Sequence, residues 1–171
     1  MRAVRSTPPG VTVVDVDEPE GPGELVRVRS ASICASDFGY IQAGSGFILG
    51  HELAGVTEDG TPVAIEAIFG CAECEYCVEG RFNLCATVGA TALGLSVDGG
   101  MSEWFRAPAR SLVPLPAGLD PSNGCLVEPA AVAWHACRLT GVGPGQRVAV
   151  VGGGAIGLLA VAAARARGAA E

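Results

Sequence analysis

The stretch QRVAVVGGGAIG (residues 146–157) predicts a buried strand, a glycine turn and the start of a helix. The run of apolar residues up to Val151 is typical of a strand covered on both faces in a parallel sheet. An Ala/Leu/Val-rich helix is expected over residues 155–167, and Gly168 follows it as a candidate C-cap. This order predicts the first β-α unit of a Rossmann dinucleotide-binding domain.

The glycines of this turn fit the pattern G-x-G-x-x-G. In that pattern Gly152 permits the tight turn, Gly154 allows close approach of a pyrophosphate, and Gly157 lets helix and strand pack. The N–H groups of Ala155 and Ile156, at the helix N-terminus, would face the phosphates. The alternative is an ordinary strand–helix turn that binds nothing.

The Rossmann unit is incomplete within these 171 residues. The pattern requires an acidic residue about twenty positions further on to bind the ribose, and about six parallel strands in all. Glu171 comes too early for that role, so the choice between NAD and NADP stays open. We expect residues 1–140 to form one domain and residues 141–171 the start of a second, so that the chain is an N-terminal fragment.

Upstream of this unit, short apolar runs alternate with Gly/Pro turn signals, which predicts a mostly β domain with some α, built as a small barrel. From Asp120-Pro121 onward the apolar spacing becomes helical, with proline at the first helical position. The expected strands are residues 1–6, 11–14, 25–33, 53–57, 62–67, 104–107 and 112–115.

Composition excludes several classes of protein. The net charge is −7 and all eleven basic residues are arginines without a basic stripe, so neither a nucleic acid nor a membrane is an expected partner. The N-terminus lacks the apolar core of a signal peptide. Seven cysteines without such a peptide predict a reducing compartment, and we expect the cytoplasm.

Four of the cysteines form the pattern C-x2-C-x2-C-x7-C within residues 70–86. Four thiolates are the usual ligands of a structural zinc ion, which would supply folding energy to a loop with little core. An iron–sulfur cluster is the rival. The bacterial cluster pattern, however, has three residues between its third and fourth cysteines and a proline after the fourth, whereas this chain has seven residues there. Four ordinary buried thiols are the other alternative. The cysteines are Cys71, Cys74, Cys77 and Cys85.

A second set of potential metal ligands is dispersed along the chain. Cys34 lies in C-A-S-D, His51 in G-H-E and Glu128 in V-E-P. A catalytic zinc site has three protein ligands of these types and an open position. Taken singly, each residue is as well explained by an ordinary buried or hydrogen-bonded role.

Together, G-H-E-L-A-G-V, C-A-S-D, the four-cysteine segment and V-V-G-G-G-A-I-G resemble the zinc-dependent medium-chain alcohol dehydrogenase family. E-P-A-A-V-A-W-H-A resembles its polyol and threonine dehydrogenase branch. The resemblance implies a GroES-like β-barrel catalytic domain and two zinc ions, with NAD or NADP as cofactor. It makes Cys34 and His51 catalytic zinc ligands, with Glu52 or Glu128 as the third, and the four-cysteine segment the structural zinc lobe.

The same resemblance gives roles to two neighbours of Cys34. Ser36 corresponds to a hydroxyl that relays the substrate proton, and Asp37 to the carboxylate that fixes the tautomer of the zinc-binding histidine. Both are also common capping residues for the helix expected after Cys34. The stretch VTEDGTPVAI, from Val56, is shorter than the family's usual connection, which is a departure within the branch.

For the complete protein these features predict hydride transfer between a secondary alcohol or polyol and a nicotinamide cofactor, in a homodimer or homotetramer. The fragment alone is expected to be inactive. A non-catalytic zinc-binding structural or interaction module with the same fold is the alternative. A zinc-free reductase of the same superfamily is disfavoured by the presence of both Cys34 and His51.

Overall fold

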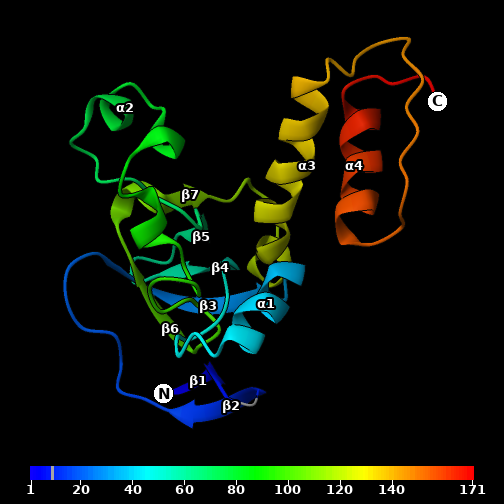
Figure 1. Cartoon of the computed structure of the whole chain (residues 1–171). Helices are drawn as coiled ribbons and strands as arrows, with labels where there is room; N and C mark the ends of the chain where they lie inside the picture. Colours follow the sequence, from blue (N-terminus) through cyan, green and yellow to red (C-terminus); the bar gives the residue numbers. More distant parts are fainter. Residues whose placement is uncertain (9) are drawn as a thin grey trace. The chain divides into compact units, whose positions relative to one another are not determined.

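The computed structural model describes residues 1–8 and 10–171, which form two compact units, Met1–Cys125 and Leu126–Glu171 (Figure 1). Each unit has its own small core, and each is described by itself below. The sequence-based domain division after residue 140 stays a prediction.

All seven predicted strands are present in the first unit, and they form two antiparallel sheets. One sheet pairs β1 with β2, and the other has the order β6-β3-β4-β5-β7. The strands are β1 (Arg2–Thr7), β2 (Gly10–Asp15), β3 (Glu24–Ser32), β4 (Glu52–Thr57), β5 (Pro62–Ile65), β6 (Trp104–Ala107) and β7 (Leu112–Pro114).

The predicted barrel is not closed among the described residues. Single backbone hydrogen bonds connect β1 to neighbouring segments, from Val4 to the carbonyl of Met101 and from Leu49 to that of Val4. The N–H groups of Gly99 and Gly100 bond the carbonyls of Ile48 and Gly50 instead, and β1 pairs with these segments only at isolated bridges.

The core of the first unit lies on the inner face of the five-stranded sheet. Alternate residues of β3, β4, β5 and β6 point into it, as the period of two requires. Val26 and Leu53 are no more than 1% exposed at its centre. The buried members are Val26, Leu53, Val63, Ile65, Leu93, Phe105 and Ala107.

A β-bulge sets the register between β3 and β4. Val28 pairs with Gly55, but Ser30 pairs with Ala54, so Arg29 is an extra residue on β3. Gly55 permits this close approach, because a Cβ there would collide with the carbonyl oxygen of Arg27. Without the bulge the end of β3 would be shifted by one residue against β4.

Short helices follow the strands in the first unit. The longest is α1 (Ala35–Ala43), which begins directly after Cys34, as predicted. The four-cysteine segment contains α2 (Glu75–Val78) and the 3-10 turn η1 (Phe82–Leu84), and a second 3-10 turn, η2 (Val88–Thr91), follows the segment. A further turn, η3 (Ala109–Ser111), precedes β7.

Asp120 caps a 3-10 turn rather than the predicted α-helix. Its carboxylate accepts a hydrogen bond from the backbone N–H of Ser122 at 2.8 Å, and η4 (Pro121–Leu126) follows. The α-helix α3 (Val127–Leu139) starts only after that turn, in the second unit.

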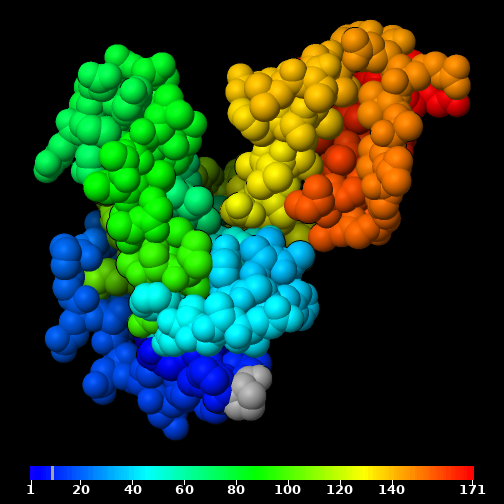
Figure 2. All heavy atoms as spheres, in the orientation of Figure 1, coloured from blue at the N-terminus to red at the C-terminus, as the bar shows by residue number. Residues whose placement is uncertain are grey.

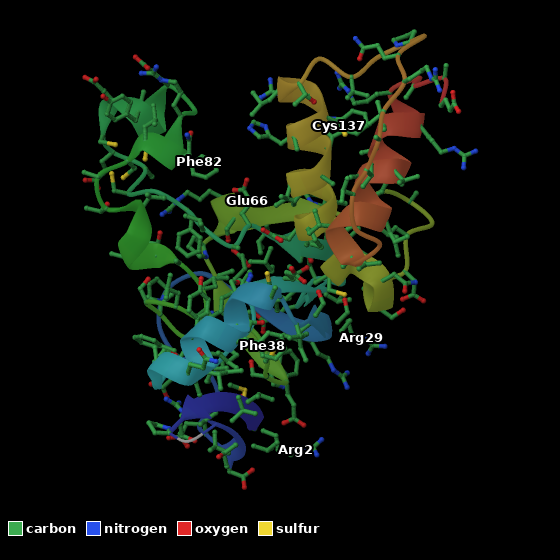
Figure 3. The ribbon with its side chains drawn as sticks, turned by 45° about the vertical axis from the view of Figure 1, so that its right-hand side comes forward. Arg2, Arg29, Phe38, Glu66, Phe82 and Cys137 are labelled. Carbon is green, nitrogen blue, oxygen red and sulfur yellow. The ribbon has the colours of Figure 1, made fainter. Side chains whose placement is uncertain are left out.

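In the second unit α3 packs against α4 (Ala155–Ala166). Cys137 lies between these helices, 7% exposed, with its sulfur 3.9 Å from the carbonyl oxygen of Ala160, so it is a core residue (Figure 3). The predicted C-cap Gly168 has the left-handed φ of +91° that glycine favours.

The predicted buried strand over residues 146–151 is wrong for this structure. The segment has no strand assignment, and Val151 is fully exposed. Its hydrogen bonds go to the last residues of the chain, from Val148 to Glu171 and from Ala170 to Gln146. A buried parallel strand requires neighbouring strands and covered faces, and the described part of the second unit contains no strand.

Across the described residues, the structure contains no helix with the length and apolar character needed to span a membrane.

Candidate metal centres

The first candidate centre forms where β3 ends and β4 begins. Antiparallel pairing brings these ends together, and Cys34 then starts α1 while His51 precedes β4. One ligand atom each from Cys34, His51 and Glu52 lies within 4.8 Å of the others. A thiolate, an imidazole and a carboxylate at this separation match the donor types of a catalytic zinc site.

Asp37 and His51 are coupled inside this centre. Oδ1 of Asp37 lies 3.3 Å from Nδ1 of His51, and Asp37 is only 1% exposed. The other oxygen, Oδ2, accepts a hydrogen bond from the backbone N–H of Cys34 at 2.9 Å. A carboxylate facing Nδ1 favours the tautomer with the proton on that nitrogen, which leaves the lone pair of Nε2 available to a metal ion.

Ser36 lies beside the other nitrogen of the same ring. Its hydroxyl is 3.5 Å from Nε2 of His51, and the residue is exposed. Asp37 therefore combines the two roles weighed from the sequence, since it caps α1 and faces the histidine. Ser36 lies in the first turn of α1 with its hydroxyl directed to the candidate centre.

Glu52 is a buried carboxylate at this centre, 6% exposed. It accepts a hydrogen bond from the hydroxyl of Ser32 at 2.5 Å. Sequence reasoning missed Ser32, because no motif or spacing marks its hydroxyl as a partner of Glu52. Glu128 lies in the first turn of α3, in the second unit, and stays the predicted alternative ligand.

The second candidate centre is the four-cysteine lobe, residues 70–86, the predicted structural zinc site. One sulfur atom of each of Cys71, Cys74, Cys77 and Cys85 lies within 4.8 Å of the others. In Figure 3 sulfur atoms lie beside the short helices of the lobe, near Phe82. The lobe is coloured green in Figure 2.

Backbone geometry holds these sulfur atoms together. The N–H of Cys71 points to Sγ of Cys85 at 3.5 Å, and that of Cys74 to Sγ of Cys71 at 3.3 Å. Gly70 is required by close approach, because a Cβ there would collide with Sγ of Cys77. The lobe is therefore shaped around its sulfur atoms, with little apolar core beneath them.

The thiols of the lobe differ in acidity. The Thr87 hydroxyl, hydrogen-bonded to the thiol, lowers the pKa of Cys85 to about 6, whereas burial raises the pKa of Cys77 to about 12. The backbone N–H of Glu73 lowers the pKa of Cys71. Four sulfur donors so close together fit a soft tetrahedral ion, whose binding would displace the remaining protons.

The glycine turn before α4 has the backbone form that its motif requires. Gly152 has a φ of +108°, which favours glycine, and a Cβ on Gly157 would collide with the carbonyl oxygen of Gly152. Gly154 is the N-cap of α4. The N–H groups at this helix end are those that phosphates bind in such motifs, and the cofactor contacts stay a prediction.

The chain is similar to known dehydrogenases. Residues 21–117 match the family model "Alcohol dehydrogenase GroES-like domain". L-galactonate-5-dehydrogenase of Escherichia coli is 34% identical over 85% of this chain and 46% of its own, and Bacillus subtilis sorbitol dehydrogenase is 36% identical with the same coverage.

Solved structures agree with this similarity. Galactitol-1-phosphate dehydrogenase from Escherichia coli superposes with a TM-score of 0.89 at 29% identity, over 99% of this chain and 54% of that one. A zinc-binding dehydrogenase from Sinorhizobium meliloti, bound to NADP, gives a TM-score of 0.87 at 34% identity with the same coverage. The chain spans about half the length of these relatives. It belongs to the zinc-type medium-chain alcohol dehydrogenase family, in the polyol dehydrogenase branch.

Proposed function

We propose that this chain supplies the metal-binding half of an oxidoreductase that moves hydride between a secondary alcohol or polyol and a nicotinamide cofactor. The observation that carries the proposal is the grouping of Cys34, His51 and Glu52 within 4.8 Å, with Asp37 directed to the histidine. Relatives named D-xylulose reductase and sorbitol dehydrogenase support the substrate class.

Cys34, His51 and Glu52 would hold the catalytic zinc ion, with Glu128 as the alternative third ligand. Zinc bound there supplies Lewis-acid chemistry that stabilises negative charge on the substrate oxygen. Asp37 keeps the Nδ1 proton of His51 in position, so that Nε2 stays a donor. The buried carboxylate of Glu52 adds negative charge to the site.

Ser36 is suited to carry the substrate proton outward. Its hydroxyl lies beside His51 Nε2 and the residue is exposed, so it can accept a proton at the site and pass one to solvent. A hydroxyl serves in this role because it is both donor and acceptor. The glycine turn at Gly152, Gly154 and Gly157, with Ala155 and Ile156, would bind the pyrophosphate of NAD or NADP.

The four-cysteine lobe would hold the second, structural zinc ion. All seven cysteines are free thiols, which suits the cytoplasm that we propose for the protein. We also propose a homodimer or homotetramer for the complete enzyme, and no turnover by residues 1–171 alone, because the glycine turn and α4 are only a small part of a dinucleotide-binding domain.

Activity is tested best on residues 1–171 alone and on a fusion to the C-terminal half of Bacillus subtilis sorbitol dehydrogenase. The fusion should reduce NAD or NADP with a polyol and lose this activity on His51→Ala. The control His135→Ala removes an exposed histidine of α3 and should keep it. A folded, zinc-loaded fusion that oxidises no secondary alcohol or polyol would refute the proposal, and turnover by residues 1–171 alone would refute the expected inactivity.

A further inference from the structure

Ser32 and Glu52 form a cross-strand pair at the end of the β3–β4 ladder. Their Cα atoms are partners in the register, and the Ser32 hydroxyl donates to Oε2 of Glu52 at 2.5 Å. A hydrogen bond that a carboxylate accepts is stronger than one between two neutral groups. The pair lies directly beside the candidate centre, since Glu52 is one of its three donors.

The bulge at Arg29 is what creates this pair. Upstream of it Val28 faces Gly55, a register that would set Ser32 opposite His51 if it continued to the end of the strand. The extra residue moves Ser32 opposite Glu52 instead. β-bulges re-aim side chains next to functional sites, and Gly55 makes this one sterically possible.

Glu52 needs such a partner because its carboxylate is buried. At 6% exposure the carboxylate has lost most of its water, and an ionised buried group must be hydrogen-bonded or paired. Ser32 engages one oxygen, Oε2. This bond restrains the side chain and leaves the carboxylate with further lone pairs for a metal ion.

We infer that Ser32 is a positioning residue that holds Glu52 as the third protein ligand of the catalytic metal ion. The inference rests on the proposed function, because it assumes that Cys34 and His51 bind that ion. Ser32 touches neither substrate nor metal. It acts through the orientation of the Glu52 carboxylate, and thereby favours Glu52 over Glu128 for this coordination position.

The test measures cobalt(II) and zinc binding to the 171-residue chain by visible absorption and by chelator competition. Ser32→Ala should weaken binding at the first centre about 10- to 100-fold, the usual effect of removing a partner of a metal ligand. Ser32→Thr keeps the hydroxyl and should restore affinity to within a few-fold of wild type. Ser30→Ala is the matched control, since its hydroxyl bonds the carbonyl of Pro121 instead.

A double-mutant cycle with Glu52→Gln separates positioning from a general loss of structure. If Ser32 acts through Glu52, Ser32→Ala weakens binding little further in the Glu52→Gln background. The cobalt–thiolate absorption of the four-cysteine lobe reports in each variant whether the fold persists. Equal and independent losses in both backgrounds would overturn the inference.

Two failures can be told apart. If wild type and Ser32→Ala bind metal equally at a centre that Cys34→Ala abolishes, the inference about Ser32 is wrong and the proposed function stands. If Cys34→Ala binds as much metal as wild type, with the same affinity, the chain has no first centre. The proposed function and the inference then fail together.

Discussion

The Asp37 carboxylate lies 3.3 Å from Nδ1 of His51, and both atoms are buried without another hydrogen-bond partner among the described residues. A buried carboxylate and an imidazole nitrogen facing each other stabilise one tautomer of the ring. This relationship makes His51 a ready metal donor through Nε2. Asp37 also has a second role, because its other oxygen accepts a hydrogen bond from the backbone N–H of Cys34, the N-cap of α1.

We predict that Asp37→Asn weakens zinc binding at the first centre about 10- to 100-fold. Asparagine places an NH2 donor where one of the two carboxylate oxygens lies, so it cannot accept at both the Cys34 N–H and His51 Nδ1. Chelator competition measures the affinity. Asp59→Asn is the control, since the Asp59 carboxylate also accepts a backbone N–H, that of Thr61, in the exposed turn between β4 and β5. Equal affinities in wild type and Asp37→Asn would contradict this account of His51.

Gly70→Ala should disrupt the four-cysteine lobe, because the new Cβ would collide with the sulfur of Cys77. We expect a loss of about 1–3 kcal/mol, typical of overpacking, and faster proteolysis within residues 70–86. Gly89→Ala is a matched control, since a Cβ there meets nothing within 4 Å. Thermal melts and limited proteolysis with zinc present compare the two, and identical behaviour would show that the lobe tolerates a methyl group there.

Glu66 gives the chain a pH-dependent cost in stability. Burial raises the pKa of this carboxyl above its usual 4.5, so folding disfavours its ionised form. Relative to neutral pH, Glu66 therefore stabilises the fold below pH 4.5. This stabilisation is lost as pH rises through the raised pKa of the folded state. Glu66→Gln should therefore melt higher than wild type at pH 7 and equally at pH 4.

Glu103→Gln is the opposite control for that measurement. The backbone N–H of Arg2 lowers the pKa of Glu103, so its stabilising contribution is present at pH 7 and is lost as pH falls through the lowered folded pKa. Each variant is compared with wild type at the same pH, because acid affects the cysteine lobe equally in both proteins. A Glu66→Gln melting temperature below that of wild type at pH 7 would refute the burial argument.

The strands and the lobe could be predicted because their signals are local. Apolar alternation and Gly/Pro turns gave all seven strands, and the spacing of four cysteines predicted the group that the structure brings together. The strand expected over residues 146–151 could not be judged locally, because a parallel strand depends on neighbours far along a chain. The open sheets in place of a barrel likewise depend on long-range pairing.

The details of the first centre were predictable only in part. The residue types at Cys34 and His51 were visible in the sequence, and their proximity followed from a family resemblance. The contact between Ser32 and Glu52 was not predictable, because it depends on a one-residue bulge. A shift of one residue in register changes which side chains face each other, and no periodic pattern around Arg29 marks it.

The central claim is that this chain holds two separate metal centres, one of them catalytic in type. Zinc per chain, measured by plasma mass spectrometry on wild type, Cys34→Ala and the control Cys125→Ala, tests it most directly. We predict two zinc ions in wild type and in Cys125→Ala, and one in Cys34→Ala. One zinc ion in all three proteins would contradict the claim, and would leave a structural zinc module in place of a dehydrogenase active site.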